Sequence, residues 1–157
     1  MKISIVEVIQ LMLAPGIMIS ACGLLLLGMN NRYSLVVNRI RLLNEEKRRL
    51  FTRAGERDFN YEENVRLESL SVQLRQLTYR VKIVRNAVLC YSGAVAMFVV
   101  TSLLIGMAYF GDTDRLNILI TIIFLAGMVS VLAGILFAGY ETKKGYDIIN
   151  LEVKIDE

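Results

Sequence analysis

The feature that most constrains the fold of this chain is a set of three long stretches without a charged residue. They run from Val8 to Asn31, from Asn86 to Gly111 and from Leu116 to Tyr140. Each is at least as long as the ~20 apolar residues that an α-helix needs to cross the hydrocarbon core of a bilayer. The sequence therefore predicts three transmembrane helices.

The first stretch has three interpretations: a signal peptide, a lipoprotein cleavage site and a permanent helix. The run "ISAC", from Ile19 to Cys22, has the small residues before a cysteine that lipoprotein signals use. However, Glu7 neutralises Lys2, so the positively charged beginning of a signal peptide is absent. Apolar sequence also continues past Cys22. We expect a permanent helix, with cleavage as the alternative.

The charges orient the predicted helices. Residues 32–85 contain 13 Lys/Arg and 7 Asp/Glu, a net charge of +6, whereas the short segment 112–115 has a net charge of −1. Positive residues in loops shorter than ~60 residues stay on the cytoplasmic side of a membrane. We therefore expect residues 32–85 and the C-terminus inside the cell and the N-terminus outside.

Pro15 leaves the start of the first helix open. Proline is tolerated in the first turn of a helix, so residues 3–13 would form a short interfacial helix before the main one. Alternatively, Pro15 kinks one long helix. The sequence does not choose between the two.

Two runs of apolar residues at heptad spacing lie around the charged segment 32–85, and such spacing is typical of coiled coils. The first is Tyr33, Val36, Ile40, Leu43, Lys47, Leu50 and Ala54, interrupted by the lysine, and the second is Leu67, Leu70, Leu74, Leu77, Val81, Val84 and Val88. A polar segment, residues 55–64, separates them and predicts a turn. Residues 32–85 are therefore predicted to form an antiparallel coiled-coil hairpin that extends the first two membrane helices into the cytoplasm.

The predicted fold is an all-α integral membrane protein with six segments. They are the N-terminal segment and first membrane helix (1–31), the hairpin (32–85), the second membrane helix (86–111), a short external loop (112–115), the third membrane helix (116–140) and an acidic cytoplasmic tail (141–157). In the tail, Ile149, Leu151, Val153 and Ile155 alternate as in a strand, whereas Ile148, Leu151 and Ile155 fit a continuing helix. We expect the helix, docked against the basic hairpin.

The sequence resembles the family named domain of unknown function 2721. The resemblance rests on Pro15, Ser20, the run "GLLLL" from Gly23, "NNR" ending at Arg32, then Arg39 and Arg41, and on Arg80 and Arg85 before the second apolar stretch. It covers nearly the whole chain. It implies a small, mostly bacterial membrane protein with three spans, and it implies no established activity or catalytic residue. We expect the chain in the bacterial cytoplasmic (inner) membrane.

The residues of common catalytic and binding sites are sparse. The three stretches contain no Asp, Glu, Lys, Arg or His, which usually mark proton relays and ion-coupled transport. There is no histidine, and Cys22 and Cys90 lie in apolar stretches, which disfavours a metal site or a disulfide framework. We therefore expect no enzyme, no catalytic residue, no metal and no cofactor. Orientation already accounts for the basic residues of the hairpin, so we expect no nucleic-acid partner.

Small residues mark two helix faces, and small residues let membrane helices approach closely. One set, the helix-packing set within residues 116–140, is Gly127, Ser130, Gly134 and Ala138. The other set, called the small-polar stripe below, is Ser20, Gly23, Leu27, Asn30, Ser34, Asn38 and Arg41. It lies roughly opposite the heptad run from Val36 to Leu50. It is the candidate pore or oligomer face.

Two hypotheses of function follow, and both include the lipid bilayer as a partner. The leading one is a homo-oligomeric channel for ions or small solutes around the small-polar stripe, with Leu27 as an apolar constriction. The alternative is a membrane scaffold or assembly factor that presents the basic hairpin to a cytoplasmic protein or to anionic lipid. In a third interpretation the stripe only packs against residues 116–140 of its own chain, where Ser130 and Gly134 offer a groove.

Overall fold

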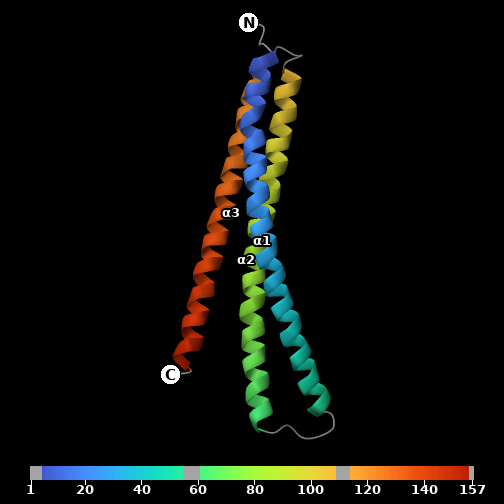
Figure 1. Cartoon of the computed structure of the whole chain (residues 1–157), viewed down its shortest axis with the longest axis vertical. Coiled ribbons are helices and arrows are strands. Elements are labelled where there is room, and N and C mark those ends of the chain that lie inside the picture. Colours follow the sequence, from blue (N-terminus) through green and yellow to red (C-terminus); the bar gives the residue numbers. More distant parts are fainter. Residues whose placement is uncertain (1–4, 55–60, 109–113, 156–157) are drawn as a thin grey trace.

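The computed structural model is built from three long α-helices (Figure 1), which are α1 (Ile5–Ala54), α2 (Tyr61–Ala108) and α3 (Asp114–Ile155). The structure describes residues 5–54, 61–108 and 114–155, and these contain no strand. Each helix includes a segment that is long and apolar enough to cross a membrane. The all-α prediction with three such helices is therefore confirmed.

The helices continue through the predicted segment boundaries. Both ends of the predicted hairpin lie inside continuous helices, and α3 runs past residue 140 to Ile155, so the tail is helical to that point and the strand alternative is wrong. Because α2 begins at Tyr61, the last four residues of the predicted turn 55–64 are helical; the other six lie outside the described residues. Likewise Asp114 begins α3, so half of the predicted loop 112–115 is helical, and residues 112–113 lie outside the described part.

Pro15 lies inside α1, which runs without interruption from Ile5 to Ala54. The alternative in which the main helix begins near Pro15 is therefore wrong. Proline has no N–H group and leaves one carbonyl of the preceding turn without its usual partner. The ring is nevertheless fully buried, so this position contributes to packing.

The second helix is the centre of the arrangement. It packs along α1 on one side and along α3 on the other, whereas α1 and α3 meet at only a few positions. The C-terminal part of α3 diverges from the other two helices, and α1 and α2 continue together beyond it (Figure 1). The chain therefore forms an open arrangement of helices, in which α1 exposes much of its surface.

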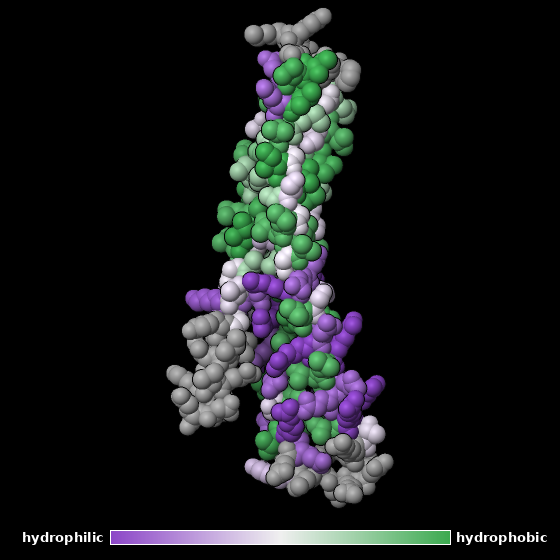
Figure 2. Space-filling view, viewed as in Figure 1, coloured by the Kyte–Doolittle hydropathy of each residue, from purple (hydrophilic) through white to green (hydrophobic). Residues whose placement is uncertain are grey.

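The core lies between the helices and is narrow. One cluster joins Met29 of α1 to Val84, Ala87 and Tyr91 of α2. A neighbouring cluster contains Cys22, Ala94 and Phe98. Most other large apolar side chains are exposed, and they concentrate in one half of the molecule, while the other half is largely hydrophilic (Figure 2). An apolar surface of this extent marks contact with lipid or with another protein.

Candidate functional site

The three helices bring charged residues together where the uncharged stretches end. Arg32 directly follows the first stretch, Glu141 directly follows the third, and Arg80 precedes the second. Because α2 is antiparallel to its neighbours, these positions reach the same level of the molecule. We call these residues the Arg32–Glu141–Arg80 cluster.

The carboxylate of Glu141 accepts hydrogen bonds from both arginines. Arg80 Nη2 and Nε lie 2.5 and 3.2 Å from Oε1, and Arg32 Nη1 lies 3.2 Å from Oε2. Arg32 Nη1 also donates to Thr142 Oγ1 at 2.8 Å. The Glu141 side chain is only 3% exposed, against 24% for Arg80 and 50% for Arg32. The cluster is thus a buried acid held by two partly accessible bases.

Burying an ionised carboxylate is costly unless charged partners and hydrogen bonds compensate for the lost water. Here both oxygens of Glu141 have guanidinium donors, and such charge-assisted bonds are about twice as strong as neutral ones. The absence of a side chain at Gly145 also leaves room for Arg80, since a Cβ there would lie 3.1 Å from its Nη2. The cluster as a whole keeps one positive charge.

A second polar contact joins α2 to α3 at this level. Tyr79, next to Arg80 in the sequence, shares a side-chain hydrogen bond with Tyr140. This hydrogen bond raises the pKa of the Tyr79 phenol. The polar links between α2 and α3 therefore continue over adjacent residues of both helices.

A cleft of about 490 Å³, called the arginine cleft below, opens beside the cluster. It is lined by Arg32, Leu35, Val36 and Arg39 of α1, Leu77 and Arg80 of α2, and Glu141, Thr142 and Gly145 of α3. Arg39 is exposed, and within the described part of the chain its guanidinium makes no ion pair or hydrogen bond. The cleft therefore combines an unneutralised arginine with apolar walls.

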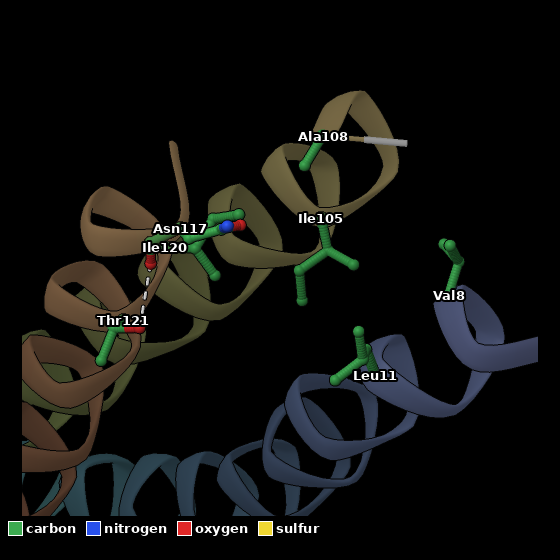
Figure 3. A pocket seen from close by; sticks show the side chains of 7 residues that line it. All are labelled: Val8, Leu11, Ile105, Ala108, Asn117, Ile120 and Thr121. Atoms are coloured by element: carbon green, nitrogen blue, oxygen red, sulfur yellow. Dashed lines mark hydrogen bonds between the residues drawn. The ribbon is translucent and has the colours of Figure 1, made fainter. Parts of the chain in front are cut away.

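A second cleft, of about 200 Å³, lies at the other end of the molecule, where all three helices contribute side chains (Figure 3). Its lining is Val8, Leu11, Ile105, Ala108, Asn117, Ile120 and Thr121. Thr121 Oγ1 donates to the backbone oxygen of Asn117 at 2.9 Å, so this hydroxyl is used within α3. The lining contains no charged residue.

All seven residues of the small-polar stripe are exposed on α1. Leu27 is 69% exposed, and a Cβ at Gly23 would have no neighbouring atom within 4 Å. The hydroxyl of Ser20 donates to the backbone oxygen of Gly16 at 3.2 Å. The stripe lies on the side of α1 away from Val36, which is buried.

The predicted packing residues of α3 contact α2. Gly134 lies against the ring of Tyr91, Gly127 against Phe98, and Ala138 against the cluster that contains Tyr91. Ser130 Oγ donates to the backbone oxygen of Cys90 at 2.8 Å. Since these groups contact α2 and the stripe is exposed, the structure does not bring the two sets together.

Sequence reasoning missed the role of Glu141. It counted Glu141 as the first residue of an acidic tail, and it assigned Arg32 and Arg80 to membrane orientation. One signal was present in the sequence: Glu141 is an acidic residue directly after the third uncharged stretch. In an antiparallel arrangement of three helices, this position lies at the level where the first stretch ends and the second begins. The predicted contact between tail and hairpin is present at Glu141 and Thr142, which bind Arg32.

The described residues do not include three or more His, Cys, Asp or Glu side chains placed to hold a metal ion. The two cysteines are free thiols; Cys22 is buried and Cys90 is half-buried. The arrangement therefore offers charge recognition at the arginine cleft and helix packing along the exposed stripe.

These features define a class of protein, namely a chain whose described residues form three helices that are each long and apolar enough to cross a membrane. A family model described as "Protein of unknown function (DUF2721)" matches residues 12–151, and the chain belongs to this family. The resemblance noted from the sequence is thereby confirmed, and the match includes the cluster and both sets of small residues. No curated protein and no solved structure matches the chain.

Proposed function

We propose that the chain is a multi-pass protein of the bacterial inner membrane that assembles into a homo-oligomeric channel around the small-polar stripe. The observation that carries the proposal is the exposure of the whole stripe on the side of α1 away from α2. One protomer has no wall on that side, so an enclosed path requires a symmetric ring of chains.

Membrane insertion is supported by the division of the surface into an apolar half and a hydrophilic half (Figure 2). The first uncharged stretch, Val8 to Asn31, covers roughly 36 Å at 1.5 Å per residue, which exceeds the ~30 Å hydrocarbon core. The Arg32–Glu141–Arg80 cluster lies at the polar end of these stretches, where arginines reach the lipid headgroups. The basic hairpin then faces the cytoplasm.

The coiled-coil hairpin is supported by contacts between the lower parts of α1 and α2. Val36 and Leu70, one from each heptad run, are buried. Further toward the turn, Arg66 Nη2 of α2 lies 2.8 Å from Glu46 Oε1 of α1. Apolar residues along the seam with an ion pair beside it are the arrangement expected of a coiled coil.

The oligomer is tested by filling the stripe. Gly23→Leu adds a large side chain at a position that is empty in the protomer, so we expect the protomer to fold and the oligomer to be lost or reduced. Gly28→Leu is the matched control, because it makes the same change at an equally open position of α1 outside the stripe. Light scattering in detergent gives the molecular mass, and hence the oligomeric state, of the parent protein and of both variants. A monomeric parent, or equal effects of the two variants, would contradict the proposal.

The channel itself is tested by Leu27→Ser. A polar residue in an apolar constriction admits water, so we expect higher ion flux from proteoliposomes than with the parent protein. Leu24→Ser is the control, since Leu24 is an equally exposed leucine of α1 outside the stripe. Unchanged flux from a well-folded Leu27→Ser oligomer would end the pore assignment.

The scaffold alternative is favoured by one observation. Leu42, Val65 and Val72 are exposed in the hydrophilic half of the molecule, where lipid tails would not cover them. A photo-crosslinking residue placed at Val72 in cells distinguishes the two functions. Crosslinks to a different protein would support the scaffold, and crosslinks only to other copies of this chain would contradict it.

A further inference from the structure

We propose that the arginine cleft binds the phosphate of an anionic phospholipid from the cytoplasmic leaflet. The inference rests on the membrane insertion proposed above and is independent of the channel. Three arginines that come from two helices line a cleft of about 490 Å³, a size within the range of ~300–1,000 Å³ of small-molecule sites.

The charges of the cleft favour an anion. Glu141 neutralises only one of the two arginines that it contacts, and Arg39 adds an exposed guanidinium that has no partner among the described residues. The cleft therefore carries a net charge of about +2 from the four charged side chains that line it, since arginine stays protonated. Within the described residues the hydrogen bonds of Arg32 use Nη1 alone, which leaves its Nε and Nη2 as donors.

The geometry of the cluster shows how these arginines receive an oxyanion. Arg80 places two nitrogens, Nε and Nη2, on one oxygen of Glu141. Planar guanidinium groups bind phosphate in the same way that they bind carboxylate. A phosphate beside Glu141 would meet the unused donors of Arg32 and the guanidinium of Arg39.

The apolar walls favour a phospholipid over a free anion. Leu35, Val36 and Leu77 line the same cleft as the arginines, and Leu35 is exposed. Arg32, at the top of the α1 wall, follows the uncharged stretch directly. A headgroup in the cleft therefore has its phosphate near arginine and its glycerol and upper acyl chains near leucine, at the depth where a bilayer holds them. The negative surface of the cytoplasmic leaflet adds to this preference.

The test measures binding of the full-length protein to lipid by native mass spectrometry, with phosphatidylglycerol as the probe and phosphatidylcholine as the reference. We expect phosphatidylglycerol to be preferred, and we expect Arg39→Gln to weaken its binding about fivefold, the effect of one basic residue near an anionic surface. Arg39 makes no contact within the cluster, so the variant should fold.

Arg75→Gln is the matched control. It removes the same charge from an exposed position of α2 that lies outside the small-polar stripe and does not line the cleft. It should leave the preference for phosphatidylglycerol unchanged. Equal losses in Arg39→Gln and Arg75→Gln would mean general charge attraction and would overturn the site, as would the absence of any preference in the parent protein.

Two further measurements distinguish a phospholipid from a free anion and test membrane insertion separately. Leu35→Ser should weaken binding of phosphatidylglycerol, and displacement of the lipid by millimolar inorganic phosphate would instead assign the cleft to a free anion and overturn the proposal. Flotation with phosphatidylcholine vesicles tests insertion separately. Protein that fails to float contradicts the proposed membrane insertion; protein that floats without preferring phosphatidylglycerol contradicts the lipid site alone.

Discussion

Gly134 of α3 packs against the Tyr91 ring of α2, and adding one methyl group there measures how tightly the two helices pack. A Cβ at Gly134 would lie 2.7 Å from Cε1 and 2.9 Å from Cδ1 of the Tyr91 ring. Non-bonded carbon atoms prefer ~3.5–4.0 Å. The Tyr91 ring cannot easily move aside, because the residue is 1% exposed. Gly134→Ala must therefore displace the ring or separate the helices.

The size of the effect follows from two opposing contributions. Alanine is favoured over glycine inside a helix by roughly 1 kcal/mol, whereas overpacking a well-filled core costs ~1–3 kcal/mol. Gly139→Ala is the matched control on the same helix, because a Cβ there has no neighbour within 4 Å. The helix preference is the same at both positions, so the stabilities of the two variants should differ by the overpacking cost alone, ~1–3 kcal/mol.

The assay is reversible unfolding in mixed detergent micelles, followed by circular dichroism. We expect Gly139→Ala to be at least as stable as the parent protein and Gly134→Ala to be less stable than Gly139→Ala. In a double-mutant cycle, Gly134→Ala should cost less in a Tyr91→Leu background than in the parent protein, since the smaller side chain removes the clash. Equal stabilities of the two alanine variants would refute the reasoning.

Two further predictions use the same unfolding assay. Glu141→Gln removes the charge that holds two arginines, and we expect the free energy of unfolding to fall by ~2–3 kcal/mol, which is less than the ~3–5 kcal/mol of a fully buried pair because Arg32 reaches solvent. The control is Glu45→Gln, which breaks an exposed pair with Arg49 and should cost no more than ~0.5 kcal/mol. Equal losses in the two variants would contradict a structural role for the cluster. Phe98→Ala should cost ~3 kcal/mol or more, because its fully buried ring fills the space between α2 and α3, and a loss below ~1 kcal/mol would contradict close packing there.

The three helices could be predicted from the sequence because three long stretches without charged residues specify them. The residues at which the helices begin and end could not be predicted. The polar residues from Tyr61 to Asn64 look like a continuing turn, yet the structure makes them the first turn of α2. Acidic residues such as Glu63 are stabilised near the positive end of the helix dipole, so polarity at this position does not exclude a helix. Likewise α3 begins at Asp114, inside the predicted loop.

The small residues of α3 were predictable from helical periodicity, because three- and four-residue spacing determines which side chains share a face. The choice of neighbour was not predictable. Periodicity does not distinguish whether Gly134 meets α1 or α2, and only the arrangement around α2 places it against Tyr91. The Arg32–Glu141–Arg80 cluster was harder still to predict from the sequence, since Glu141 and Arg80 are 61 residues apart. Their pairing depends on the relative level of two antiparallel helices, which no local pattern encodes.

Two different kinds of contact hold α3 to the rest of the chain. In the apolar half, Gly127 and Gly134 pack against aromatic rings of α2, and these contacts involve no charge. At the polar end, Glu141 joins α3 to both other helices through arginines. Because α1 and α3 otherwise meet at few positions, the bond from Arg32 is a principal link between them. Breaking this bond would therefore loosen α3 from α1 at the arginine cleft while the packing between α2 and α3 stays intact.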